Sequence, residues 1–187
     1  MSEQPGRYQR SASGMVGALA VTLLVIGAFV AFRAFSRTDL NAGPERVDYL
    51  AQVRYAQESG ADVVYPAGLP SGWYATQVSV TPGSPPGFEL SMLTADGQYV
   101  GLVQSSEPLD QVLTTYVDPH PQAGRHVTVA GRVASHWQTW TDAGGDTALA
   151  RERGHGSAQE SLLVFGTVPQ AALEKLAASL TTAKIPG

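Results

Sequence analysis

The 187-residue sequence contains no cysteine, and its basic residues are few. The absence of cysteine excludes disulfides, thiolate metal ligands, cysteine nucleophiles and a lipid anchor on cysteine. From residue 61 onward, six Lys and Arg stand against eleven Asp and Glu, a net charge of −5. Because no basic stripe exists, the sequence disfavours nucleic-acid binding and a polybasic grip on anionic lipid.

Charge is also missing from the eighteen residues between Met15 and Phe32, which are almost entirely apolar. A helix of this length crosses most of a hydrocarbon core about 30 Å thick. Thr22 is its only polar side chain, which disfavours a buried core helix. The residues around Ala34 make a poor cleavage site, which disfavours a removable signal peptide. We therefore predict one transmembrane helix over residues 14–35.

The orientation of this helix is not fixed by charge, because Arg7 and Arg10 on one side balance Arg33 and Arg37 on the other. We expect the commoner arrangement, a cell-membrane protein with a cytoplasmic N-terminus and an extracytoplasmic C-terminal domain. The predicted division is a short cytoplasmic tail (1–13), the transmembrane helix (14–35), a juxtamembrane connector and helix (36–60), and the extracytoplasmic domain (61–187).

The periodicity of the remaining sequence predicts an α+β domain, an antiparallel β-sheet packed with flanking helices. Asp96-Gly97, between two alternating apolar runs, predicts a hairpin with a type I′ turn. Thr167 and Gln170 form a predicted capping box for the last helix. Helices are expected over 44–58, 106–117 and the residues after 167, and strands over 73–80, 88–92, 100–102, 126–140 (continuous past Gly131), 147–153 and 161–167.

No residue pattern identifies a reaction. The sequence lacks the GxSxG nucleophile elbow, a phosphate-binding glycine loop and an HExxH metal motif. Asp118, His120, His126 and His136 are candidates for a hydrolytic or metal site, although Asp118-Pro-His120-Pro is also typical of a rigid turn. We therefore assign no catalytic, cofactor-binding or metal-binding residue and expect no cofactor.

Two tryptophans are the candidates for a binding surface. Trp137 and Trp140 are three residues apart, so they face opposite sides of a regular strand. One of them, together with His136 and Gln138, could line a groove or lie against the bilayer surface. The competing interpretation places Trp73 and one of this pair in the core.

The arrangement of short motifs resembles a known family. A Leu-Pro-x-Gly-Trp entry (Leu69–Trp73), a Val-x-Val-x-Gly strand (Val127–Gly131) and a Gly-Thr-Val segment (Gly166–Val168) follow the apolar run. This pattern is similar to an actinobacterial family of membrane-anchored proteins classed as a domain of unknown function (DUF4245-like). It is also distantly similar to sheet-plus-helix modules of some bacterial anti-sigma and lipoprotein-type proteins. The resemblance implies a domain outside the cytoplasmic membrane and supplies no catalytic residues.

Three functions follow as hypotheses. The first is a non-enzymatic, single-pass membrane protein whose outer domain binds a protein or another component of the cell envelope. The second is a carrier or sensor for a lipid or other hydrophobic ligand, held between the sheet and the helix around Leu109–Tyr116. The third is a hydrolase or metalloenzyme that uses Asp118 and the nearby histidines.

Overall fold

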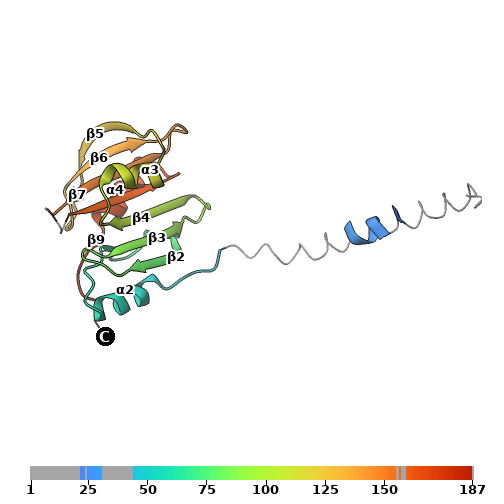
Figure 1. Ribbon diagram of the computed structural model, residues 1–187, viewed down its shortest axis with the longest axis horizontal. Helices are drawn as coiled ribbons and strands as arrows, with labels where there is room; N and C mark the ends of the chain where they lie inside the picture. Colours follow the sequence, from blue (N-terminus) through green and yellow to red (C-terminus); the bar gives the residue numbers. More distant parts are fainter. Residues whose placement is uncertain (1–21, 24, 31–43, 155, 157–158, 187) are drawn as a thin grey trace, which may run out of the picture. The chain divides into compact units, whose positions relative to one another are not determined.

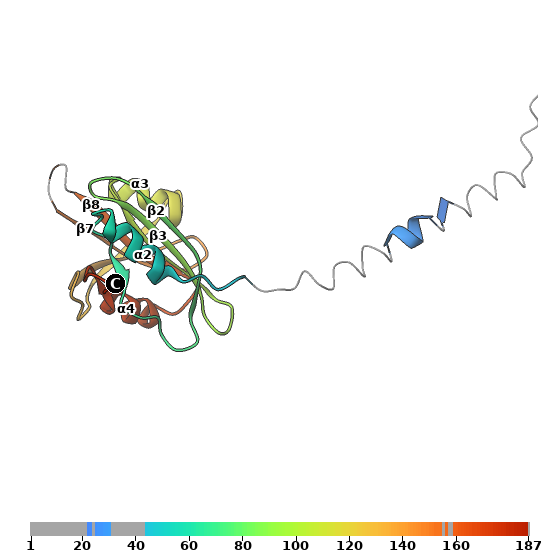
Figure 2. The ribbon, with the colours of Figure 1, turned by 90° about the horizontal axis from the view of Figure 1, so that it is seen from below.

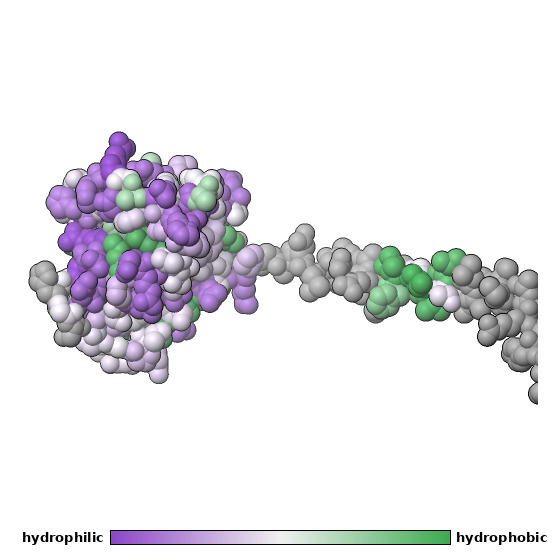
Figure 3. All heavy atoms as spheres, turned by 45° about the horizontal axis from the view of Figure 1, so that its top comes forward, coloured by the Kyte–Doolittle hydropathy of each residue, from purple (hydrophilic) through white to green (hydrophobic). Residues whose placement is uncertain are grey.

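A computed structural model describes residues 22–23, 25–30, 44–154, 156 and 159–186. The chain divides into two compact units, Met1–Pro44 and Glu45–Gly187. In the first unit, residues 22–23 and 25–30 are helical and their surface is largely apolar (Figure 3). Most of the predicted span 14–35 and the whole predicted tail 1–13 lie outside the described residues. No helix among the residues described has the length and apolarity that a membrane crossing needs.

The second unit is built on a seven-stranded antiparallel sheet (Figure 1). Its order is β2-β3-β4-β8-β7-β6-β5, so β2 and β5 are the two edges. The strands are β2 (Tyr74–Thr81), β3 (Gly87–Leu93), β4 (Tyr99–Ser105), β5 (Gln122–Thr128), β6 (His136–Thr141), β7 (Thr147–Arg153) and β8 (Glu160–Gly166). A separate pair joins β1 (Tyr65–Pro66) to β9 (Leu180–Thr181). The predicted α+β class with an antiparallel sheet is confirmed.

Helices cover both faces of the sheet. Figure 2 shows α3 (Leu109–Tyr116) and α4 (Gln170–Ala178) on opposite sides. On the α4 face, the larger core joins alternate residues of the strands, such as Phe88, Leu90 and Met92, to α4 and to α2 (Tyr49–Glu58). On the other face, α3 packs Val112 and Leu113 onto a smaller core. Burial of these apolar side chains is the main source of stability of the unit.

The helix α2 belongs to the folded unit, although the sequence placed it in the connector. Its core side consists of Tyr49, Val53 and Ala56. The prediction of its start at Pro44 was wrong. The helix begins at Tyr49 because the Asp48 carboxylate accepts the N–H of Ala51 and so caps it, while the N–H of Val47 donates instead to the carbonyl of Ala75 in β2.

Three other local predictions were wrong in detail. Asp96-Gly97 does lie in the β3–β4 hairpin, but only Gly97 has a positive φ, so the turn is not type I′. The hydroxyl of Thr167 accepts the N–H of Tyr99 rather than capping α4, whose N-cap is Pro169. Residues 126–140 are not one strand but the hairpin of β5 and β6. The chain reverses next to Gly131, where an added Cβ would lie 2.9 Å from the Ala134 carbonyl oxygen and 3.1 Å from that of Ala177 in α4.

Candidate functional site

The face of the sheet that carries α3 also contains an open groove. It has a volume of about 540 Å³ and lies between the start of α3 and the strands β5, β6 and β7. We call it the α3 groove; its lining residues are Leu109, Ala123, His126, His136, Trp137, Gln138, Trp140, Ala150, Arg151 and Glu152. The groove brings together the three binding candidates of the sequence, Trp137, Trp140 and His136, and adds His126.

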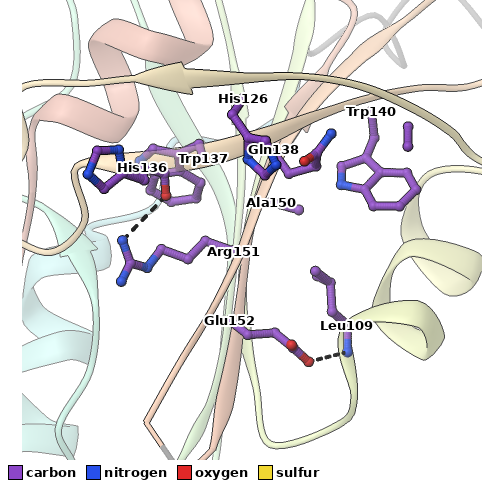
Figure 4. Close-up of a pocket in the computed structure, with 10 residues that line it drawn as sticks. Leu109, His126, His136, Trp137, Gln138, Trp140, Ala150, Arg151 and Glu152 are labelled. Carbon is purple, nitrogen blue, oxygen red and sulfur yellow. Dashed lines mark hydrogen bonds between the residues drawn. The ribbon is translucent and has the colours of Figure 1, made fainter.

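Strand register explains which side chains reach this groove. His126 of β5 pairs with Gln138 of β6, which in turn pairs with Ala150 of β7. Directly paired residues point to the same face of a sheet. The three side chains therefore form a row across three strands, which Figure 4 shows with Trp140 beside Gln138. The small side chain of Ala150 leaves space at the β7 end of the row.

Polar contacts fix α3 beside the groove. A carboxylate oxygen of Glu152, Oε1, accepts the backbone N–H of Leu109 at 3.2 Å and the amide of Gln159 at 3.0 Å (Figure 4). At the other end of the helix, the hydroxyl of Tyr116 donates to Glu89 at 2.8 Å. Burial, followed by this bond to Glu89, raises the pKa of Tyr116 to about 12. The phenol therefore stays protonated at neutral pH and keeps α3 joined to β3.

The two tryptophans lie on opposite faces, as predicted. Trp137 is 1% exposed and packs in the larger core, so its ring is a core residue at the edge of the groove. Trp140 is half-buried and packs in the smaller core beside α3. Its indole nitrogen has no hydrogen-bond partner, and Figure 4 shows that nitrogen on the side of the ring that faces Gln138. Trp73 is partly buried against the larger core.

At one end of the groove the strands β6 and β7 separate. Their pairing ends at Gln138 and Ala150. Beyond that point the guanidinium of Arg151 donates to the carbonyl of His136 at 3.3 Å and spans the gap. Figure 4 shows Arg151 and Glu152 pointing to opposite sides of β7. The side chain of Arg151 thus replaces the missing backbone pairing, and Glu152 lies on the side of α3.

The histidine and aspartate candidates make few of the side-chain hydrogen bonds that a catalytic or metal site uses. Within the described part of the chain, no histidine side chain takes part in a hydrogen bond or ion pair. No group of three or more described His, Asp or Glu residues has a geometry that could hold a metal ion. Asp118 accepts the backbone N–H of His120 at 2.7 Å and of Ala143 at 3.1 Å, and these bonds lower its pKa. Its carboxylate therefore joins two loops.

Sequence reasoning named Gln138 as a groove candidate and the helix around Leu109 as a separate ligand site, but it missed Ala150 and did not bring the three residues together in one site. Gln138 and Ala150 become neighbours only through the pairing of β6 with β7, and Leu109 reaches them only because α3 crosses this face. No spacing in the sequence reports that pairing. The alternation that put Trp140 on the same face as His136 and Gln138 was the one available signal.

Among curated proteins, none matches the chain. Among solved structures, it is similar to a chain of the MucA/MucB complex of Pseudomonas aeruginosa. The identity is 15% and the TM-score 0.36, over 65% of this chain and 35% of that chain. The chain thus spans about a third of the length of that solved chain. A family model described as "Protein of unknown function (DUF4245)" matches residues 7–180, and the chain belongs to this family.

Proposed function

We propose that the chain is a non-enzymatic binding protein, held at the outer face of a membrane by residues 14–35, and that the α3 groove receives a partner protein or another component of the cell envelope. The observation that carries this proposal is the groove itself, which is open and is lined by apolar side chains together with polar ones such as Gln138 and His136. Protein interfaces likewise combine apolar contact surface with polar groups.

The side chains of the groove suit contact better than chemistry. Trp140 offers a half-buried aromatic surface, and tryptophan is among the residues that contribute most to protein binding. The carboxylate of Glu152 is occupied by α3 and Gln159, and the amide of Gln138 donates to the carbonyl of Gly124. An activated nucleophile needs a neighbouring base that a third group orients. The bonds of Glu152 and Gln138 support a binding role over a hydrolytic one.

A hydrophobic small ligand is the second candidate. It is favoured by the apolar residues between the sheet and α3, where Leu109, Ala123, Trp140 and Ala150 line the groove. A largely apolar pocket with a few polar groups is the usual form of a small-molecule site. The openness of the groove favours a protein over a fully enclosed lipid chain.

Photo-crosslinking in cells distinguishes these candidates. A photoreactive amino acid replaces Ala123, an exposed residue of the groove, in the full-length chain. The matched control carries the same amino acid at Ala143, which is exposed in the β6–β7 turn outside the groove. We expect a protein or envelope adduct at position 123 only. A lipid-sized adduct seen by native mass spectrometry would transfer the proposal to the second candidate, and equal adducts at both positions would refute the groove as a site.

A further inference from the structure

The opposite edge of the sheet contains a second groove, independent of the α3 groove. It has a volume of about 420 Å³ and lies between α2 and the outer strand β2. We call it the edge groove; its lining includes Tyr55 and Gln52 of α2, Ser59 directly after that helix, Val78 and Val80 of β2, and Gly83. We infer that the edge groove binds an extended segment of a partner protein, which adds a strand to β2.

Half of the β2 edge is open. At its start, the carbonyl of Ala75 accepts the N–H of Val47, so the chain preceding α2 covers that end. In the described residues, only β3 bonds to the backbone of the strand from Gln77 to Thr81. Alternate N–H and C=O groups along an edge strand point outward, and an extended backbone is the partner that pairs with them in series. The open edge therefore selects an extended segment.

The side chains around this edge provide anchoring contacts. Tyr55 is 71% exposed, the most exposed large hydrophobic residue among those described in the folded unit. Val78 and Val80 are half-buried on the same side of β2, two residues apart. An added strand places every second side chain on that side, so apolar residues at alternate positions of the partner would meet Val78, Val80 and Tyr55. An exposed tyrosine beside such a groove is typical of a protein-binding surface.

Charge favours a different protein over a second copy of this chain. Residues 61–187 have a net charge of −5, and two such domains repel each other. The occupant we infer is therefore a segment with alternating apolar residues and without excess negative charge. The C-terminal residues of the chain leave the groove free, because they bind Gln57, which lies two residues and thus about 200° around α2 from Tyr55.

The test selects peptides from a phage-displayed random library of dodecamers on the full-length protein in detergent micelles. We expect selected peptides with apolar residues at alternate positions. Their affinity should fall at least tenfold in Tyr55→Glu and stay within twofold in Ala143→Glu, which adds the same charge at an exposed position of the β6–β7 turn, away from the edge groove. Bound peptide should also slow amide exchange between Gln77 and Thr81.

Other outcomes overturn the inference. Equal binding to Tyr55→Glu and the wild type would place the peptides elsewhere, and binding without protection of β2 would exclude strand addition. A library that yields no binding peptide would also refute it. If sedimentation shows a dimer that Tyr55→Glu dissociates, the occupant is a second copy. None of these results bears on cross-linking at Ala123, so the two proposals fail separately.

Discussion

Gln104 donates a hydrogen bond from Nε2 to Oε2 of Glu160 at 2.7 Å, and both side chains are buried. The side-chain amide oxygen of Gln104, Oε1, also accepts the N–H of Val64 at 2.7 Å. The other carboxylate oxygen of Glu160 pairs with Arg153. One glutamine therefore connects β4, β8 and the segment before β1.

We expect Gln104→Leu to lower the free energy of unfolding by about 2–4 kcal/mol, because it leaves the N–H of Val64 and part of a buried carboxylate without partners. Chemical denaturation followed by tryptophan fluorescence measures this change. Gln111→Leu, on the exposed side of α3, is the control and should change stability by less than about 0.5 kcal/mol. If Gln104→Leu leaves the free energy of unfolding unchanged, the hydrogen bonds of Gln104 contribute little to stability.

Tyr49 makes stability depend on alkaline pH. Its hydroxyl donates to the carbonyl of Pro66 at 2.9 Å, and burial, followed by the nearby Tyr65 and Asp48, raises its pKa to about 12 from 10.0. Because the unfolded chain loses this proton first, the contribution is complete below pH 10.0 and is lost as the pH rises toward about 12. Tyr49→Phe should cost about 1 kcal/mol at pH 7 through the lost hydrogen bond.

Between pH 10 and 11.5, Tyr49→Phe should lose less stability than the wild type. Plots of the free energy of unfolding against pH should therefore approach each other for the two proteins. Urea denaturation at stepped pH values measures both curves. The free energy of unfolding of Tyr49→Phe should still fall as the pH rises, because the pKa of Tyr116 and that of Tyr65 are raised as well. Parallel curves would show that Tyr49 ionises equally in both states.

Gly166, at the end of β8, should not tolerate a side chain. Its φ is +157°, and an added Cβ would collide with the carbonyl oxygen of Tyr99 and lie 2.9 Å from the Cα of Val100. Because backbone atoms of β4 form this contact, they cannot rotate away, and Gly166→Ala should destabilise by about 2–3 kcal/mol. Gly68→Ala is the control, since nothing lies within 4 Å of its added Cβ. Thermal unfolding compares the two variants.

The topology prediction has a direct test. Residues 184–186, which the structure describes, end at the surface of the folded unit, so a reporter fused after Gly187 should leave that unit intact. We expect an alkaline phosphatase fusion to be active, because that enzyme folds only outside the cytoplasm. A fusion that is produced stably but is inactive would reverse the predicted orientation. Removal of residues 14–35 should release the protein from the membrane fraction.

The sequence predicts a feature well where a local pattern decides it. Phe88, Leu90 and Met92 alternate, and all three are buried on one face of β3. Likewise, the spacing of Trp137 and Trp140 placed them on opposite faces whatever the register of β6. Such predictions need only the period of the element.

Features decided by distant contacts were missed. Residues 129–135 contain few turn-forming residues apart from Gly131, so the reversal between β5 and β6 looked like a continuous strand. At this reversal the N–H of Val129 donates to the carbonyl of Ser135, and a side chain at Gly131 would also meet Ala177 of α4, which comes from far along the chain. The α3 groove depends on the same hairpin, because the row of His126, Gln138 and Ala150 exists only after β5 has turned back on β6.

Gln57 has a consequence for engineering this domain. Its amide holds Ala183 and Ile185, and the helix that carries it begins at Tyr49, near the start of the folded unit. From Asp48 to Gln57 the helix rises only about 14 Å, so the two ends of the unit are neighbours. A short linker can therefore join the two ends in a circular permutant that is opened in the Asp142–Asp146 turn. For the same reason, the whole unit can be inserted into a loop of another protein.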